Sequence, residues 1–247
     1  MLLALLTDLH ANREALSACL AHAQRSKAER YAFLGDLVGY GADPGWVLDS
    51  IMDFAGRGAV VVLGNHDAAV LHGPLKSMNA DAQKVIAWTR TQLTAPQLEF
   101  LSGLPLQVED GERLFVHANA WAPERWQYIL GPYDARSSMA ATRCRYTFCG
   151  HVHEPALYHM GADWRATAFK PVAGTGIPLG SQRRWLAIPG SVGQPRDGIP
   201  AACYALFDTG TSTLTYFRVA YDFAAAARKI REAGLPERFV VLLEEGR

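Results

Sequence analysis

The sequence lacks several features that would assign it to particular classes of protein. No apolar run approaches the roughly 18 residues of a membrane-spanning helix. Its 24 Lys and Arg balance its 24 Asp and Glu, and no block of like charge stands out, so the basic stripe typical of nucleic-acid-binding proteins is missing. The N-terminal stretch MLLALLTDLH has no basic segment before its short apolar run. We therefore expect it to form a first strand and not a signal peptide.

Cysteine is also scarce. The four residues, Cys19, Cys144, Cys149 and Cys203, lie in apolar contexts, and the spacing in CRYTFC is too wide for a CxxC metal site. We expect buried, reduced thiols in a cytoplasmic protein, because disulfides are rare in that compartment. Hydrophobic residues make up 49% of the chain and charged residues 19%, which is the composition of a folded globular protein and not of a disordered one.

The first half of the sequence contains an alternation of strand and helix. Short continuous apolar runs are typical of strands covered on both faces, and they lie at residues 2–6, 31–34 and 59–63. Apolar residues at helical spacing predict helices at 12–23, 44–52 and 79–93. A capping box at Thr94 begins a further helix, which we expect to end near Gly103.

The second half changes character. Short strand candidates, mostly separated by Gly, Pro, Asp and Ser, predict hairpins, and they lie at residues 114–116, 146–149, 156–159, 185–188, 203–207 and 214–219. A last helix is expected over 221–232. A strand–helix–strand start followed by a meander predicts an α/β (α+β) fold, in which two sheets pack together with helices outside.

Asp, Asn or His ends five of the predicted strands. These residues are, in order, Asp8 and His10, then Asp36, then Asn65, His66 and Asp67, then His117, and last His151 and His153. In α/β sheets, ligands collect at the carboxyl ends of strands. Residues two apart in an extended chain point the same way, so we expect each of the two spaced pairs to converge on one point. Glycines at 35, 64 and 150 predict sharp turns close to a ligand.

Each of these residues also has an ordinary structural interpretation. A single Asp after a strand is usually a turn former or a helix N-cap. A single His is more often a packed or surface group than a ligand, and we expect that of His22, His72 and His159. Five of the eight histidines, however, lie at four strand ends beside Asp8 and Asp36, and this repetition favours a common site.

Five sequence blocks carry a resemblance to a known family. They are DLH at 8–10, GDLVGYG at 35–41, GNHD at 64–67, VHA at 116–118 and GHVH at 150–153. Together they resemble the calcineurin-like metallophosphoesterases, over a match from Leu2 to about Val219. The stretch PGSVGQPRDG at 189–198 is similar to a bacterial and archaeal phosphodiesterase branch, some of whose relatives cleave diadenosine tetraphosphate. The fourth block departs from the VHG that is common in the family.

The resemblance implies a fold and a set of residue roles. The fold would be a four-layer α/β/β/α sandwich of two mixed sheets flanked by helices. It would form one domain over 1–247, with a helical insertion at about 74–103 and a C-terminal helix from about 221. His66 would be the catalytic histidine that faces the leaving group, and Asp67 would orient its ring. One metal would be held by Asp8, His10, Asp36 and His153, and a second by Asp36, Asn65, His117 and His151, with Asp36 bridging.

Such a ligand set defines the expected chemistry. Nitrogen and carboxylate ligands without thiolate suit divalent Mn, Fe, Zn, Ni or Co, and we expect Mn to support activity. Two ions would share a bridging hydroxide that attacks phosphorus. With two carboxylates and one hydroxide, the site would keep about one net positive charge for a phosphate anion.

Other residues are candidates for substrate contacts. Arg13 and Arg196 could bind a non-bridging phosphate oxygen, since Arg suits bidentate phosphate contact, or each could be a surface ion-pair partner. Tyr40, Trp121 and Trp126 could stack on a base or aryl leaving group, although core packing is the commoner role for such residues.

We expect a hydrolase of phosphodiester or nucleotide polyphosphate bonds. Its substrate would be a phosphorylated small molecule such as a nucleotide, with neither membrane nor nucleic acid as a partner. A phosphomonoesterase or protein-phosphatase-like enzyme is one alternative, and a non-catalytic scaffold that kept the sheets is another. A decayed site should show substitutions in the blocks, yet all seven ligand positions and His66 are present. The balanced charge disfavours a nuclease, and the sequence indicates no oligomeric state.

Overall fold

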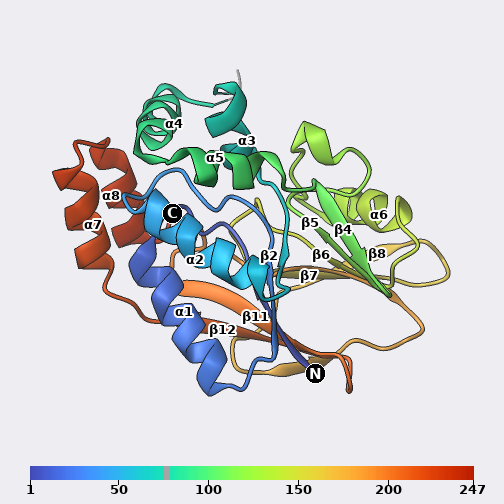
Figure 1. Cartoon of the computed structure of the whole chain (residues 1–247). Coiled ribbons are helices and arrows are strands. Elements are labelled where there is room, and N and C mark those ends of the chain that lie inside the picture. The colour runs from blue at the N-terminus through green and yellow to red at the C-terminus, as the bar shows by residue number, and fades with distance from the viewer. Residues whose placement is uncertain (75–77) are drawn as a thin grey trace.

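The computed structural model describes residues 1–74 and 78–247. Within them, two six-stranded sheets pack face to face with helices outside (Figure 1). The first sheet has the order β3-β2-β1-β11-β12-β9 and the second the order β4-β5-β6-β10-β7-β8. The predicted four-layer sandwich of two mixed sheets is therefore confirmed.

The first sheet is built on the N-terminal strand–helix units. Its strands are β1 (Leu2–Leu6), β2 (Arg30–Phe33), β3 (Val60–Val61), β9 (Gly176–Pro178), β11 (Ala202–Asp208) and β12 (Thr213–Val219). The first three run parallel, because α1 (Arg13–Arg25) and α2 (Pro44–Gly56) return the chain between them. The strand β11 then pairs antiparallel with β1, and β12 with β11.

The second sheet gathers the middle of the chain. Its strands are β4 (Gln107–Asp110), β5 (Arg113–Val116), β6 (Tyr146–Phe148), β7 (Ala156–Met160), β8 (Ala166–Phe169) and β10 (Arg184–Ile188). The strands β5, β6 and β10 are parallel neighbours, while β4, β7 and β8 pair antiparallel. The helix α6 (Pro132–Ala140) covers the outer face of this sheet (Figure 1).

The core lies in three apolar layers. Leu5, Phe148 and Phe207 are among the buried side chains between the two sheets. Leu16 and Phe33 belong to the layer under α1 and α2, and a third layer lies under α6. This sandwich places the carboxyl ends of β1 and β2 in one sheet near those of β5 and β6 in the other.

Helices also cover one end of the sandwich. They are α3 (Asn65–His72), α4 (Ala80–Gln92), α5 (Ala95–Ser102), α7 (Phe223–Glu232) and α8 (Glu237–Glu245). The last two pack on each other, and α8 and Val85 of α4 share an apolar cluster (Figure 1). None of the helices in the described part of the chain is long and apolar enough to cross a membrane.

The structure differs from the sequence expectations at several elements. The third strand is reduced to Val60–Val61, and the polar stretch after it begins the helix α3. The strands β4, β8 and β9 and the helices α6 and α8 were not expected. The helices α4 and α5 lie in the range of the predicted insertion, of which residues 75–77 are outside the described part.

Candidate metal centre

Seven side chains converge where strands of both sheets end. They follow β1 (Asp8, His10), β2 (Asp36), β3 (Asn65), β5 (His117) and β6 (His151, His153). Each is at most 6% exposed. Their ligand atoms form two groups, one of Asp8, His10, Asp36 and His153 and one of Asp36, His117 and His151. The structure thus brings together all the residues predicted to hold metals.

The first group surrounds a point between two imidazoles. The Nε2 atoms of His10 and His153 lie 3.1 Å apart. His153 Nε2 is 3.3 Å from Asp8 Oδ1, and His10 Nε2 is 3.7 Å from Asp36 Oδ2. Two nitrogens and two carboxylate oxygens therefore face one another in a buried space.

The second group is centred on His117. Its Nε2 lies 3.1 Å from Asn65 Oδ1, 3.2 Å from His151 Nδ1 and 3.4 Å from Asp36 Oδ2. Asp36 Oδ2 is thus shared by both groups. This oxygen is buried and has no hydrogen-bond partner among the described residues, which is the condition expected of an atom that bridges two cations.

The ring orientations fit metal ligation. His10, His117 and His153 each place Nδ1 near a backbone carbonyl, at 3.3 Å from Val38, 2.7 Å from Leu34 and 2.6 Å from Gln194 respectively. Since a carbonyl only accepts, each Nδ1 carries a proton, and Nε2 is the ring nitrogen that faces the ligand group. Backbone carbonyls fix the ring tautomers of metal-binding histidines in this way.

The charge states fit as well. Burial opposes the charge on Asp8 and Asp36, but the neighbouring His153 and His117, respectively, outweigh it and hold both carboxyl pKa values below their usual range. Burial lowers the pKa of His151 to about 3. Burial also opposes the charge on His117, but the Asp36 carboxylate prevails and raises that pKa to about 9. Two ionised carboxylates therefore face imidazoles in a buried space, where cations would compensate their charge.

The backbone reaches this arrangement through left-handed turns. The φ angles are 53° at Asp8, 47° at His10, 51° at Asp36, 69° at His151 and 66° at His153. The prediction of extended chain at the two spaced pairs was therefore wrong. The side chains of His151 and His153 belong to different ligand groups. They therefore do not converge on one point, as extended chain would have required.

The three predicted glycines allow these loops to approach one another. Gly35 has φ of +85°, a left-handed conformation that suits glycine. A Cβ on Gly64 would collide with the backbone nitrogen and the carboxylate of Asp36. A Cβ on Gly150 would collide with Thr7 and with the carboxylate of Asp8. The absence of a side chain is thus what lets Asp8 and Asp36 lie against the neighbouring loops.

His66 lies in the first turn of α3, beside both groups. Its backbone nitrogen donates to Asp36 Oδ1 at 2.8 Å, and its ring packs 4.9 Å from that of His10 and 4.5 Å from that of Tyr40. Its Nδ1 is buried without a hydrogen-bond partner in the described part of the chain. Burial lowers its pKa to about 4, so the ring is neutral at physiological pH.

Asp67 has a different task from the one predicted. Its Oδ1 accepts hydrogen bonds from the backbone nitrogens of Leu37 (2.9 Å) and Val38 (3.1 Å), and its Oδ2 accepts one from Gly64 (2.9 Å). Both oxygens are thus used by backbone groups, and the ring of His66 is not among their partners. Asp67 therefore fastens the loop after Asp36 to the start of α3, and the expectation that it orients the His66 ring is corrected.

A cavity of about 500 Å³ opens onto the second group, at Asn65 and His151. His66, Asn65, His151 and Arg196 line it, together with Tyr40, Trp126 and Tyr128. Trp126 approaches His117 edge-on at 5.9 Å, and Tyr128 stacks on His151 at 4.0 Å. The tyrosine was missed by the sequence reasoning, although it lies two residues after Trp126.

Two predicted substrate contacts lie elsewhere. Arg13 is exposed and its guanidinium lies 4.9 Å from the ring centre of Trp46, away from the residues that line the cavity. Trp121 donates from its ring nitrogen to Gln127 Oε1 at 2.9 Å and does not line it either. Of the two predicted arginines, the structure brings only Arg196 to the site.

Comparisons with known proteins agree with this geometry. The family model for the calcineurin-like phosphoesterase superfamily domain matches residues 1–212. An uncharacterized protein of Methanocaldococcus jannaschii is 34% identical over 241 residues, which span 96% of this chain and 94% of that protein. The superfamily uses divalent metal ions, and the two ligand groups described above are candidates to hold them.

Solved structures share the whole fold. The metallophosphoesterase of Sphaerobacter thermophilus is 35% identical with a TM-score of 0.89, covering 100% of this chain and 99% of its own. A hypothetical protein of Pyrococcus horikoshii has a TM-score of 0.80 at 19% identity, covering 100% and 98%, which shows the fold alone. The matched family model and the first of these relatives establish that the chain belongs to the calcineurin-like phosphoesterase superfamily.

Proposed function

We propose that the chain is a dinuclear metal-dependent phosphoesterase that hydrolyses phosphodiester or nucleotide polyphosphate bonds. The observation that carries this proposal is the pair of buried ligand groups that share Asp36 Oδ2, the second of which lines a cavity. Completeness of both groups favours an enzyme over a scaffold that has kept the sheets and lost catalysis.

The metals and the protein would divide the chemistry. Two divalent ions, with Mn as the activating metal, would lower the pKa of a shared water and stabilise charge on phosphoryl oxygens. Asp8, His10, Asp36 and His153 would hold one ion, and Asp36, Asn65, His117 and His151 the other. Arg196, half-buried at the cavity wall, would bind a non-bridging phosphoryl oxygen through its planar guanidinium.

We assign His66 to the leaving group. It lines the cavity and is not a member of either ligand group, so it is free to meet the substrate. A ring N–H of His66 would donate to the oxygen that departs from phosphorus. Asp67 would act only through the backbone, by holding the loop that carries Asp36 against α3.

The size of the cavity favours a diester or a polyphosphate over a simple phosphate ester. About 500 Å³ falls within the usual range for small-molecule sites, about 300–1,000 Å³, and exceeds what one phosphoryl group needs. One further structure with this fold, at 14% identity and a TM-score of 0.53, is that of a candidate diadenosine tetraphosphatase. That likeness concerns the fold, while the nucleotide substrate is part of our proposal for this chain.

The test is turnover by metal-depleted protein that is reloaded with Mn. We expect activity to return with the metal and kcat/KM to be higher for bis(p-nitrophenyl) phosphate than for p-nitrophenyl phosphate. A preference for the monoester would make the chain a phosphomonoesterase. Protein that holds two ions and turns over no ester or polyphosphate would favour the scaffold.

A further inference from the structure

The catalytic cavity is strongly basic although the chain as a whole is neutral. Among its described lining residues are Arg125, Arg196, Arg238 and Arg247, and none of them is Asp or Glu. The chain has 24 basic and 24 acidic residues, so this imbalance is local. It arises because arginines from three separate segments of the chain meet around one opening.

Two of these arginines belong to the C-terminal end of the chain. Arg238 lies in α8 and Arg247 follows it, and both are beyond residues 1–212, which the family model matches. The helix α8 therefore lies outside the part matched by the family model, yet its residues form part of the cavity wall. Phe239, Val240 and Leu243 stand at helical spacing, although the sequence analysis did not predict a helix there.

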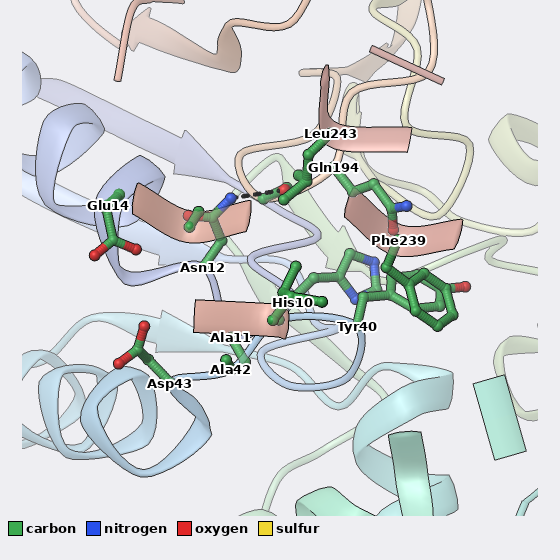
Figure 2. A pocket seen from close by; sticks show the side chains of 14 residues that line it. His10, Ala11, Asn12, Glu14, Tyr40, Ala42, Asp43, Gln194, Phe239 and Leu243 are labelled. Atoms are coloured by element: carbon green, nitrogen blue, oxygen red, sulfur yellow. Dashed lines mark hydrogen bonds between the residues drawn. The ribbon is translucent and has the colours of Figure 1, made fainter. Parts of the chain in front are cut away.

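The helix α8 is fixed directly to the site. Phe239 packs 4.8 Å from Tyr40, whose ring lies 4.4 Å from that of His10 (Figure 2). Leu243, Phe239 and His10 line a small cavity (Figure 2), which has a volume of about 10 Å³. Such a gap holds about one water molecule, so the contact between α8 and the ligand loops is nearly closed.

Polar contacts hold the rest of the C-terminal end. On α7, Lys229 Nζ donates to Glu14 at 2.5 Å and to Asp43 at 2.8 Å, which ties the helix pair to the first turn of α1 and to the N-cap of α2. Gly198 donates from its backbone nitrogen to Gly246 at 2.8 Å. This bond places Arg247 beside the loop that carries Arg196. The basic residues from the two segments are thus held side by side.

The charges of these arginines are available to a ligand. Arg238 has no ion-pair partner in the described part of the chain. Arg247 lies 3.3 Å from Glu245 and Arg125 lies 3.8 Å from Glu124, but both pairs are exposed, and such pairs contribute little. A phosphate can replace these partners with bidentate contacts.

We propose that Arg238 and Arg247 bind phosphates beyond the scissile one, so that the cavity selects substrates with at least one additional phosphate, as in a nucleoside polyphosphate. This inference rests on the proposed function. Arg196 lies nearer the ligand groups, since its neighbour in the wall is Tyr40. The phosphate chain would run from there toward α8. Trp126 and Tyr128, on the wall near His117 and His151, offer faces on which a base can stack.

The first experiment measures binding without turnover. Metal-depleted protein is titrated calorimetrically with AMP, ADP, ATP and tripolyphosphate. We expect affinity to rise with each added phosphate, and Arg238→Ala and Arg247→Ala each to weaken ATP binding about tenfold, the change that 1.4 kcal/mol gives. The matched control is Arg228→Ala, an exposed arginine on α7 that does not line the cavity. Equal affinity for AMP and ATP would overturn the inference.

The second experiment separates this inference from the proposed function. With Mn bound, we compare kcat/KM for ATP with kcat/KM for bis(p-nitrophenyl) phosphate. We expect the ratio of the two to fall about tenfold in Arg238→Ala and in Arg247→Ala and to be unchanged in the Arg228→Ala control. If the Mn-loaded wild-type protein turned over neither ATP nor the diester, the proposed function would be refuted. Persistent diester turnover with an unchanged ratio would refute only the role of Arg238 and Arg247. Binding of tripolyphosphate as tight as that of ATP would assign recognition to phosphates alone, without base stacking.

Discussion

The carboxylate of Asp67 offers the sharpest test of how the site is built. It is fully buried and accepts hydrogen bonds from the backbone nitrogens of Leu37, Val38 and Gly64. Replacement by Ala would leave three buried donors without an acceptor. The loop after Asp36 would then lose its attachment to the helix that carries His66.

The cost can be worked out from these bonds. A buried donor left without a partner costs about 1–3 kcal/mol, so the three donors predict that Asp67→Ala lowers the free energy of unfolding by about 3–9 kcal/mol. That is a large part of the roughly 5–15 kcal/mol that stabilises a typical domain. Asp67→Asn should cost less, because its remaining oxygen can still serve Leu37 and Val38 while its NH₂ group faces only Gly64.

The assay is urea unfolding of metal-free protein followed by tryptophan fluorescence. Metal is removed because a bound ion stabilises the native state and would mask the difference. The two variants should rank below the wild type, with Ala lowest. If Asp67→Ala lay within about 1 kcal/mol of the wild type, the account from backbone bonds would be refuted. A slower enzyme with unchanged stability would instead support orientation of the His66 ring.

Three further predictions concern metal binding, leaving-group chemistry and loop packing. Asp36→Ala should lower both metal content and activity, since it removes an oxygen shared by two ligand groups; full metal content by elemental analysis would contradict bridging. His66→Ala should keep its metals and lose about 10²–10⁴-fold in rate. The loss should be smaller for p-nitrophenyl esters than for alkyl esters, because a leaving group of low pKa needs no proton. Equal losses on the two ester types would exclude protonation by His66. Gly64→Ala should lower the unfolding free energy and the metal content, because its Cβ would collide with Asp36. In the control Gly56→Ala on α2, where a Cβ would meet nothing within 4 Å, stability should rise by up to about 1 kcal/mol, and a similar gain in Gly64→Ala would show that the loop tolerates the collision.

The elements predicted best are those whose signals are local. Leu2–Leu6 is a strand as expected, because a short run covered on both faces has to be continuously apolar. Asn12 and Asn79 cap their helices by accepting from Ala15 and Ala82, as helix-start residues commonly do. The polar residues at the strand ends were visible in the sequence as well. Their convergence was predictable because parallel strands bring their carboxyl ends to one edge of a sheet.

Elements with weak local signals were missed. The strand β8 is largely exposed and β9 is only three residues long, so neither shows the apolar alternation that marks a half-buried strand. The basic lining of the cavity was also invisible. Arg125, Arg196, Arg238 and Arg247 form no charge block in the sequence, and only the tertiary fold brings them together.

The left-handed turns at the ligands explain why the site could be recognised before its geometry could be derived. A non-glycine residue in this conformation costs about 1–3 kcal/mol, and no composition rule places Asp8, His10 and Asp36 there together. The loops support one another through backbone bonds: Asp8 donates to Gly35 at 3.1 Å, His10 to Asp36 at 3.0 Å, and Gly193 to Asp8 at 2.8 Å. Because these bonds join segments far apart in sequence, the positions of the ligands depend on the completed sandwich and not on any single block.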